Sequence, residues 1–352
     1  MSVALEPFGE RLLAWYDRHA RDLPWRVPPG SAEAPDPYRV WLSEVMLQQT
    51  RVAAVKPYFE RFTRRWPTVA DLAAAKDEEV MGEWAGLGYY SRARNLKACA
   101  EAVAALGGFP DTEDALRELP GIGAYTSASI AAIAFDRRAV VVDGNVERVL
   151  TRHRAIDIPM PAARASVRQA ANDLTPKERP GDYAQAVMDL GATICTPRNP
   201  VCALCPVNGD CKAFAAGDPE RYPVKVPRKA KPERVGAVFA AFDPDGAVWL
   251  VRRPDRGLLG SMAALPSTNW SAATDGETDA RAAPFPAEWK RVGEVRHGFT
   301  HFDLTLTVWR ADGVVHRRND GWWAQEGSPD RTALPTLFAK ALEVALQAEL
   351  AV

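Results

Sequence analysis

No run of about 18 consecutive apolar residues occurs in this sequence, which excludes an ordinary transmembrane helix. The amino-terminal stretch MSVALEPFGERLLAWYDRHA carries charges of both signs and lacks the apolar centre of a signal peptide. An excess of one charge is missing as well, because 44 Lys and Arg stand against 45 Asp and Glu. Any nucleic-acid site is therefore a local surface and not a basic tail. We expect a cytoplasmic protein without a membrane segment.

Cysteine is scarce, and four of the five lie within 17 residues at the spacing C-x6-C-x2-C-x5-C: Cys195, Cys202, Cys205 and Cys211. Without an export signal, disulfides are not the expected use of these thiols. Four clustered thiolates bind either a tetrahedral zinc ion or a [4Fe–4S] cluster. The residues alone leave both metals open, although only one C-x2-C pair of the kind that zinc sites favour is present. We interpret the distant Cys99 as a small core residue.

Strand patterns are missing before residue 230, apart from the apolar run AVVV at 139–142. Amphipathic helices are predicted instead, beginning with residues 6–20, and each ends near Gly or Pro. The segment VWLSEVMLQQTRVAAVKPYFERFTRRW predicts two helices with a break near Lys56–Pro57. The first domain, residues 1–222, is therefore expected to be all-α.

A Pro-, Lys- and Arg-rich stretch at 223–233 predicts a linker, and the pattern changes beyond it. VGAVFAAF, DPDG and AVWLVRR predict a strand, a turn and a strand. HFDLTLTVWRADG alternates strictly and places one set of side chains on one face: Phe302, Leu304, Leu306 and Val308. TALPTLFAKALEVALQAEL predicts a closing helix. Residues 234–352 are therefore expected to form an α+β domain.

The stretch LPGIG at 119–123 is a Gly-punctuated hairpin that runs directly into an apolar helix. Backbone N–H groups left unpaired at such a helix start suit a phosphate oxygen, although glycines in a tight turn need no ligand. Further on, Asp143 stands between the apolar run and the next helix, in VVVDGNVERVL. Asp at this place is also an ordinary helix N-cap. The residues alone leave a structural and a chemical role open for Asp143.

Glu44 lies on a largely apolar helical face, with Val40 and Trp41 before it and Leu47 and Gln48 after it at helical spacing. Desolvation there would raise the pKa of the carboxyl group and retain its proton nearer neutral pH. Those are the conditions for a general acid. The alternative is an ordinary solvated Glu at the edge of the apolar stripe.

A turn in GLGYYSRARNLK, residues 86–97, places two tyrosines beside three cations. Adjacent aromatic and cationic side chains at a loop edge fit a nucleic-acid backbone with an unstacked base. A structural tyrosine pair with solvated cations is the alternative.

These motifs resemble a known family. LPGIG before a helix, VDGNVxRV and the four-cysteine spacing are similar to the endonuclease III superfamily of helix-hairpin-helix DNA glycosylases. SEVMLQQTRV, GLGYYSRARNL, GIGAYT and LGATICTPRNPVCALCPV resemble its MutY family of adenine glycosylases over about residues 5–225, and the final domain resembles that family's Nudix-related domain. The resemblance implies a [4Fe–4S] cluster. It also implies a monomeric enzyme of base excision repair that removes adenine mispaired with 8-oxoguanine or guanine in double-stranded DNA.

The resemblance also assigns residues. Glu44 corresponds to the acid that protonates adenine N7, and Asp143 to the second carboxylate, which stabilises the sugar at C1′. Asn145 would support this pair by hydrogen bonding, and Tyr125 would lie against the sugar. The resemblance places these residues around the extruded adenine: Trp25, Arg26, Leu47 and Gln185. It places Gln48, Gln49 and Tyr89 in the base stack beside 8-oxoguanine. It assigns a DNA phosphate with a monovalent cation to Gly121 and Gly123, and 8-oxoguanine itself to Phe299, Thr300 and His301.

Two absences and one substitution refine this prediction. Relatives that also cut the strand carry a lysine where this chain has Tyr125, and a phenol cannot form the Schiff base that β-elimination needs. Nothing between Arg253 and Glu294 supplies the Glu-rich Nudix box, so the final domain is expected to recognise rather than hydrolyse. In HGFTHF, which we expect on a strand face, Thr300 replaces the family's Ser and adds a methyl group.

Two other functions remain open on the residues. One is a bifunctional endonuclease III-like glycosylase and lyase, and the other is a non-enzymatic DNA-binding iron–sulfur module. The monofunctional adenine glycosylase is the prediction that Tyr125 and the added domain favour.

Overall fold

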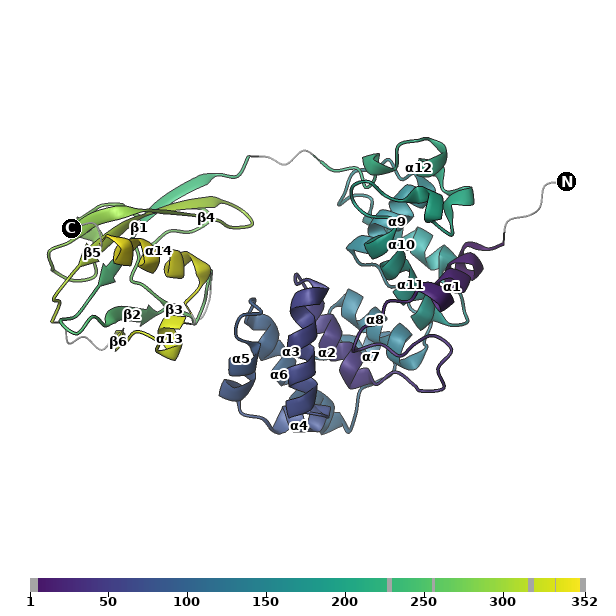
Figure 1. Ribbon diagram of the computed structural model, residues 1–352, viewed down its shortest axis with the longest axis horizontal. Coiled ribbons are helices and arrows are strands. Elements are labelled where there is room, and N and C mark those ends of the chain that lie inside the picture. The colour runs from purple at the N-terminus through teal and green to yellow at the C-terminus, as the bar shows by residue number, and fades with distance from the viewer. Residues whose placement is uncertain (1–5, 227–229, 255–256, 316–319, 333, 349–352) are drawn as a thin grey trace. The chain divides into compact units, whose positions relative to one another are not determined.

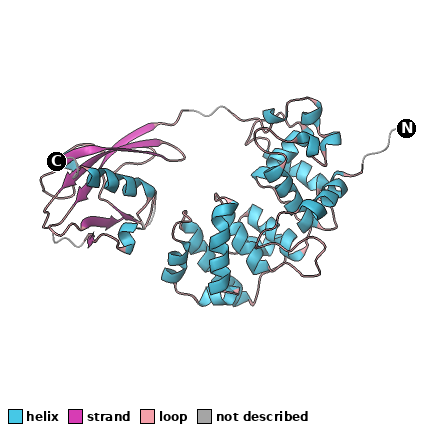
Figure 2. Ribbon diagram, viewed as in Figure 1, coloured by secondary structure: helices cyan, strands magenta, loops and turns pink. Residues whose placement is uncertain are grey.

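The computed structural model describes residues 6–226, 230–254, 257–315, 320–332 and 334–348, and it divides into two compact units, 1–227 and 228–352. The division falls inside the expected linker, of which residues 227–229 lie outside the described residues. Most of the described helices lie in the first unit, and the described strands lie in the second together with two further helices (Figure 2). The prediction of an all-α domain followed by an α+β domain is confirmed. None of the described helices is long and apolar enough to span a membrane.

The described helices of the first unit follow the predicted periodic segments closely. They are α1 (Phe8–His19), α2 (Pro37–Leu47), α3 (Val52–Arg65), α4 (Val69–Ala74), α5 (Asp77–Trp84), α6 (Ser91–Leu106), α7 (Glu113–Arg117), α8 (Ala124–Phe135), α9 (Gly144–Arg154), α10 (Arg164–Leu174), α11 (Pro180–Thr193) and α12 (Lys212–Ala215), with 3-10 turns at Cys202–Leu204, Asn208–Asp210 and Pro219–Arg221. The apolar run 139–142 is extended but pairs with no strand among the described residues.

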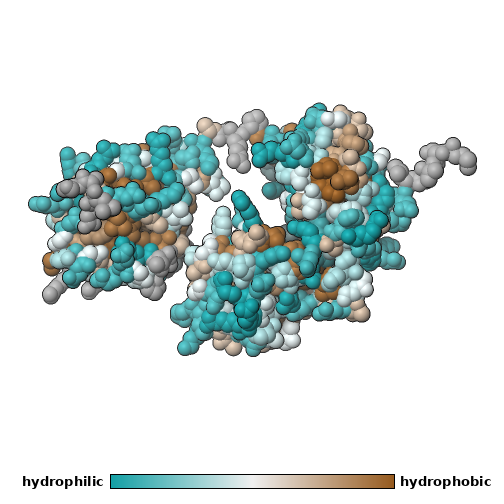
Figure 3. All heavy atoms as spheres, viewed as in Figure 1, coloured by the Kyte–Doolittle hydropathy of each residue, from teal (hydrophilic) through white to brown (hydrophobic). Residues whose placement is uncertain are grey.

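The helices of the first unit form two lobes (Figure 1). Helices α2–α8 make one lobe, and α1 with α9–α12 makes the other. One hydrophobic core runs through both and includes Trp41, Phe59, Trp84 and Leu150. Cys99, predicted as a core residue, is buried in it. Because the apolar side chains are inside, the visible face of this unit is mostly hydrophilic (Figure 3).

The predicted helix break near Lys56–Pro57 is wrong. Helix α2 ends at Leu47 and α3 begins at Val52, so the break lies at residues 48–51, and Pro57 is inside α3. Pro57 is the sixth residue of α3 and lies beyond the first four N–H groups, so the helix continues through it with one fewer backbone hydrogen bond. The break comes instead from Gln49, whose φ of 59° cannot belong to a right-handed helix.

Helix α11 packs against helices of both lobes. It contacts α8, α9 and α1, and nearly all of its residues from Pro180 to Gly191 are buried. At Gly191 a Cβ atom would lie 2.6 Å from the Cβ of Asn145. Glycine at this place therefore allows α11 to approach the start of α9 closely.

The second unit consists of two three-stranded sheets and a covering helix. Strand order is β1–β5–β4 in one sheet and β3–β2–β6 in the other. Strand β5 pairs with β1 in parallel and with β4 antiparallel, and α14 packs on this sheet. The elements are β1 (Glu233–Ala241), β2 (Val248–Arg252), β3 (Ala263–Ala264), β4 (Lys290–Gly298), β5 (Asp303–Ala311), β6 (Trp322–Ala324), a 3-10 turn (Ala280–Ala282), α13 (Pro329–Thr332) and α14 (Thr336–Gln347).

Two predictions for the elements of this unit are confirmed. The alternating residues Phe302, Leu304, Leu306 and Val308 are all buried in its core, as predicted. The strand, turn and strand near DPDG are also present, and a single antiparallel bridge joins Phe242 and Val248 at the turn. Strand β1 pairs with β5 and β2 pairs with β3 and β6, so DPDG connects two different sheets.

Candidate active site and iron–sulfur loop

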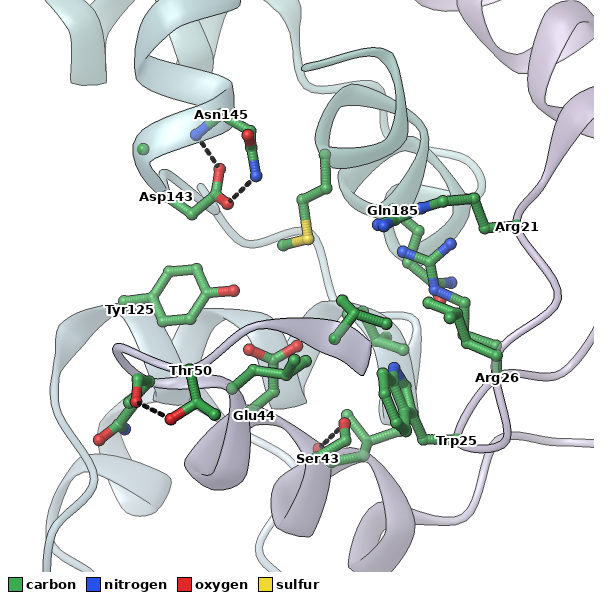
Figure 4. Close-up of a pocket in the computed structure, with 18 of the residues that line it drawn as sticks. Arg21, Trp25, Arg26, Ser43, Glu44, Thr50, Tyr125, Asp143, Asn145 and Gln185 are labelled. Atoms are coloured by element: carbon green, nitrogen blue, oxygen red, sulfur yellow. Dashed lines mark hydrogen bonds between the residues drawn. The ribbon is translucent and has the colours of Figure 1, made fainter. Parts of the chain in front are cut away.

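A cavity of about 460 Å³ lies where the two lobes of the first unit meet. Its wall is built from the segment before α2, from α2 and the turn after it, and from α8, α9 and α11. Side chains from both lobes project toward its centre (Figure 4). The cavity collects these predicted residues: Trp25, Arg26, Glu44, Leu47, Gln48, Gln49, Tyr125, Asp143, Asn145 and Gln185. Its volume is in the range of pockets that bind small molecules, so one nucleobase fits in size.

Glu44 is the buried acid of this cavity. Its helix, α2, begins at Pro37 with Asp36 as the N-cap, and all residues from Val40 to Met46 are buried. Burial raises the pKa of Glu44 above its ordinary value of 4.5, and repulsion from Asp143 adds to the rise, while the hydroxyls of Tyr125 and Ser129 and the charge of Arg26 oppose it. The solvated alternative for Glu44 is therefore excluded.

Asp143 faces the cavity from the opposite lobe and is also a helix cap. Its Oδ1 accepts the backbone N–H of Asn145 at 2.9 Å and of Val146 at 2.7 Å, and its Oδ2 accepts Asn145 Nδ2 at 2.9 Å (Figure 4). Three donors and the positive end of α9 stabilise the charged carboxylate. The capping role and an exposed negative edge toward the cavity are thus compatible.

Tyr125 lies between the two carboxyl groups on the first turn of α8 (Figure 4). Burial raises its pKa well above 10.0, and the charges of Glu44 and Asp143 raise it further. The phenol therefore keeps its proton, and it serves the cavity as a hydrogen-bond donor and not as a nucleophile.

Asp189 supports this cavity, although it is not among the residues predicted from the sequence. Its carboxylate is fully buried one helical turn after Gln185 and binds two arginines that line the cavity, with Arg21 Nε and Arg26 Nη1 both at 2.6 Å. The backbone N–H of Arg21 donates to it as well. The i, i+4 spacing from Gln185 was the available signal, because it places both side chains on one face of α11.

Arg148 is a second residue that the sequence did not reveal. It donates from Nη2 to Asn145 Oδ1 at 2.9 Å and to Gly191 O at 2.6 Å, and from Nε to Cys195 O at 2.7 Å. The Arg148 guanidinium thus links the Asn145 amide, which donates to Asp143, with the start of the cysteine loop at Cys195.

Tyr89 stands outside the cavity wall, at the turn before α6, with 61% of its surface exposed. The cations predicted beside it differ from expectation in their exposure to solvent. Arg92 and Lys97 are buried, with 8% and 7% of their surface exposed, and only Arg94 of the three cations faces solvent. Both buried side chains turn inward and donate to backbone carbonyls, so two of the three cations are neither at the loop edge, as predicted, nor solvated, as in the alternative.

The hairpin at 119–123 is formed as predicted and leads into α8 at Ala124. Gly121 has φ of 74°, and a Cβ atom there would lie 2.7 Å from the Cβ of Asn95. A glycine is therefore required at this turn by conformation and by space alike. Gly121 and Gly123 are both exposed, so their backbone groups are accessible.

The motif HGFTHF does not lie on a strand face. Strand β4 ends at Gly298 and β5 begins at Asp303, so Phe299, Thr300 and His301 form the turn between them. Phe299 N donates to Phe302 O, and the two rings stack at 4.8 Å. Thr300 and His301 are exposed at the tip of the turn. The turn forms because the Phe299 and Phe302 rings anchor its two ends in the core.

The four clustered cysteines surround one apolar cavity beside α9 and the end of α11. Among the residues that the structure describes, no three Cys, His, Asp or Glu side chains gather closely enough for a single metal ion. Cysteine side chains that lie this far apart suit a cluster in which each iron atom binds one thiolate. They suit a single tetrahedral zinc ion less well. Arg152 is buried and donates to Cys195 Sγ at 3.3 Å, so a cation lies directly beside this cysteine.

Replacing Cys205 by Ser is expected to abolish iron binding and to lower the unfolding temperature. Burial raises the pKa of the Cys205 thiol to about 12, so its thiolate is stable only beside the positive charge of a metal. Iron analysis of the purified variant and thermal unfolding measure the two effects. Cys99→Ala is the matched control, because Cys99 is buried in the helical core on α6 and its loss leaves the iron content unchanged. Stoichiometric zinc in the wild-type protein would contradict the assignment.

Comparison with known proteins agrees with this geometry. Residues 42–176 match the model of the HhH-GPD superfamily of base excision DNA repair proteins, residues 195–211 match the iron–sulfur binding domain of endonuclease III, and residues 237–344 match a NUDIX domain. The chain therefore binds a [4Fe–4S] cluster, and the matched segment begins and ends at the first and last of the four clustered cysteines.

The curated relatives share one name. The human adenine DNA glycosylase is 39% identical over 86% of this chain and 66% of its own length, and the mouse enzyme is 38% identical over 86% and 70%. The adenine DNA glycosylase of Mycolicibacterium smegmatis is 42% identical over 59% of this chain and 70% of its own length. The chain thus spans about two thirds of the length of these relatives.

Among solved structures, a thermostable thymine-DNA glycosylase matches 59% of this chain and 95% of its own chain, with 28% identity and a TM-score of 0.53. The likeness covers the helical fold of the first unit. Together with the curated relatives and the geometry of the two carboxyl groups, it leads to one conclusion. The chain belongs to the adenine DNA glycosylase family of base excision repair enzymes.

Proposed function

We propose that this enzyme hydrolyses the bond between adenine N9 and C1′ of the sugar where adenine is mispaired with 8-oxoguanine or guanine in duplex DNA. The observation that carries the proposal is the pair of unlike carboxyl groups in one cavity. Glu44 is buried with a raised pKa, and Asp143 accepts three hydrogen bonds at a helix start. Such a pair divides the work of a glycosidase between a proton donor and a charged stabiliser.

The reaction begins with proton transfer to the base and ends with the attack of water on the sugar. Glu44 donates its proton to adenine N7, and the electron pair of the N9–C1′ bond passes to the base. Asp143 stabilises the positive charge that develops at C1′, while Asn145 fixes its orientation. The Glu44 carboxylate then takes a proton from water, whose oxygen bonds to C1′. Because Tyr125 is no amine, no Schiff base with the sugar forms, and the strand remains intact.

Adenine has to leave the duplex to reach Glu44. Trp25 and Leu47 supply apolar contact for the extruded base, and Gln185 offers an acceptor and a donor to its N6/N7 edge. Arg26, fixed by Asp189, adds a charged donor at the same wall. The pocket is thus polar at one edge and apolar at its faces, as a purine requires.

Residues outside the adenine pocket contact the remainder of the DNA. Gln48, Gln49 and Tyr89 enter the base stack beside 8-oxoguanine, and the hairpin at Gly121 and Gly123 binds a phosphate together with a monovalent cation. Phe299, Thr300 and His301 of the second unit recognise 8-oxoguanine from the exposed turn. The [4Fe–4S] cluster has no redox step in base hydrolysis and serves structure and DNA binding. The enzyme acts as a monomer in the cytoplasm on chromosomal DNA.

Single-turnover reactions with 8-oxoG·A, G·A and T·A duplexes test the proposal. We expect adenine release from the 8-oxoG·A and G·A duplexes, detected after alkali treatment by strand cleavage at the adenine, with T·A uncleaved. Without alkali the strand is expected to stay intact, and borohydride is expected to trap no covalent adduct. Iron-loaded enzyme that leaves 8-oxoG·A uncleaved would refute the proposal, and trapping of an adduct would support the lyase alternative.

A further inference from the structure

Of the six described non-glycine residues of the first unit that lie in the left-handed backbone region, two stand in turns that adjoin α2 and α6. Gln49, between α2 and α3, has φ of 59°, and Tyr89, between α5 and α6, has φ of 51°. Both side chains are exposed. Such conformations cost on the order of 1 kcal/mol or more and persist only where the surrounding structure fixes them. The question is what fixes these two turns.

The guanidinium of Arg92 makes hydrogen bonds to both turns. Its Nη1 donates to the carbonyls of Val45 and Met46 at 3.0 Å and of Gln48 at 2.5 Å. Its Nη2 donates to Thr50 Oγ1 at 3.2 Å, to Gly88 O at 3.3 Å and to Leu87 O at 3.4 Å. The acceptors flank Gln49 on both sides and immediately precede Tyr89. One rigid fork therefore fixes the backbone on which both exposed side chains stand.

The environment of Arg92 is unusual for a buried cation. It lies between the rings of Trp84 and Tyr89, with its Cζ 5.3 Å from each ring centre. No carboxylate forms an ion pair with it among the described residues. Burial lowers its pKa, and its Nε has no hydrogen-bond partner in the described part of the chain. A buried charge without a counter-ion is costly, so an apolar side chain would be expected here if only packing mattered.

We propose that Arg92 is a positioning residue that joins the Gln48–Thr50 turn and the Leu87–Tyr89 turn into one rigid wedge, which enters the DNA stack as the adenine leaves it. This inference rests on the proposed function of Gln48, Gln49 and Tyr89. The guanidinium does not touch the reacting atoms. It fixes two backbone segments whose side chains must enter the duplex together, and the strain at Gln49 and Tyr89 is stored before DNA binds.

The first test separates base extrusion from chemistry. The extrusion step is followed by stopped-flow fluorescence of 2-aminopurine placed next to the adenine in an 8-oxoG·A duplex. Arg92→Met is expected to slow the fluorescence change and the single-turnover adenine release by about 10- to 100-fold, the cost of misplaced positioning groups. Arg92→Lys retains the charge but not the fork, so partial recovery is expected.

The second test excludes an effect through Glu44, since Arg92 also caps the helix that carries this residue. A positioning role in the wedge leaves the midpoint of the pH–rate profile unchanged, whereas a displaced Glu44 shifts it. Lys97→Met is the matched control. Lys97 is equally buried on the same helix but donates to Ala73 O and Glu101, away from both turns. This variant is expected to keep the wild-type extrusion rate even if its unfolding temperature falls.

If Arg92→Met fails to fold, Thr50→Val provides the decision. This variant removes one acceptor of Arg92 and the bond from Thr50 Oγ1 to Gln48 O at nearly constant volume, so several-fold slower extrusion is expected. Wild-type extrusion rates in Thr50→Val and in any folded Arg92 variant, with adenine still released by the wild-type enzyme, would overturn this inference alone. A wild-type enzyme that releases no adenine would overturn the proposed function instead.

Discussion

Glu44→Gln is expected to slow adenine release by at least about 10²- to 10⁴-fold, the contribution typical of general acid–base catalysis. The amide keeps the size and the hydrogen-bonding capacity of the side chain but has no proton to give to N7. Single-turnover kinetics on the 8-oxoG·A duplex measure the effect without interference from product release. Binding to the same duplex is expected to change little, because Glu44 lies inside the cavity and away from the phosphates.

The pH dependence follows from the raised pKa of Glu44, whose first cause is burial. The acid acts in its protonated form, so the wild-type rate falls as the pH rises through the folded-state pKa. The midpoint of this fall is expected above 4.5, the ordinary value for Glu. Glu44→Gln has no such limb. A wild-type rate that is flat through this range would show that another group donates the proton.

The same variant is expected to stabilise the folded protein at neutral pH. A carboxyl whose pKa is higher in the folded state than in the unfolded state causes no penalty below the unfolded pKa. The penalty grows as the pH rises from there to the folded pKa and is complete above it. Gln removes this penalty, so the unfolding temperature of Glu44→Gln exceeds that of the wild type at pH 7 and the difference vanishes in acid.

Glu147→Gln is the matched control for the loss of adenine release. Glu147 also has a pKa raised by burial, but it is only half-buried on α9 and lies outside the cavity wall. Its replacement is expected to leave adenine release unchanged. A rate loss in Glu147→Gln as large as that in Glu44→Gln would indicate a general effect of charge and not acid catalysis.

Local sequence patterns predicted the parts of the site that depend on one helix at a time. The apolar neighbours of Glu44 indicated its burial, and the position of Asp143 before a helix indicated a cap, which the structure has. The hairpin at 119–123 and the start of α8 also followed from the chain itself. These features are determined by residues within about one helical turn, where periodicity and capping rules apply.

Contacts across long sequence separations could not be predicted in this way. The break after α2 is fixed by Arg92, more than 40 residues away, and this side chain overrides the apparent signal of Pro57. Asp189 pairs with Arg21 and Arg26 across separations of 168 and 163 residues. Arg92 lies in the predicted motif at 86–97 and Asp189 stands four residues after Gln185, but neither position indicates these distant partners. The packing of α11 against α8 and α9 has to be known before these partners can be recognised.

The second unit shows the same limit for strands. The alternation from Phe302 to Val308 correctly predicted a half-buried strand, because a period of two is local. Its partner in the sheet, the parallel strand β1, lies about 70 residues earlier, and nothing in either segment specifies the pairing. The turn at Phe299–His301 was likewise assigned to a strand, since its aromatic residues resemble strand residues until the ends of β4 and β5 are known.

Asp143→Asn is expected to slow adenine release by about 10²- to 10³-fold while the fold is retained. Stabilisation of positive charge at C1′ requires a negative oxygen, and removing one preorganised electrostatic group from an active site has costs of this size. Asn is as good an N-cap as Asp, so its oxygen can still accept the N–H groups of Asn145 and Val146. Single-turnover rates and thermal unfolding, measured together, separate the two roles.

The surroundings determine how the new amide in Asp143→Asn lies. With its oxygen toward the α9 backbone, its NH₂ group replaces Oδ2 and meets Asn145 Nδ2, a donor facing a donor. Asn145 cannot relieve this by turning its amide over, because Arg148 Nη2 donates to its oxygen and is itself bound to Gly191 O and Cys195 O. We therefore expect a loss of stability of about 1 kcal/mol, the size of one net hydrogen bond.

Asp143→Asn together with Asn145→Asp restores an acceptor toward that NH₂ group and a partner for Arg148. Unfolding temperature is expected to recover in this double variant, whereas adenine release is not, because the negative oxygen now faces Arg148 and not the cavity. Recovery of adenine release in step with stability would show that Asp143 serves only as a helix cap.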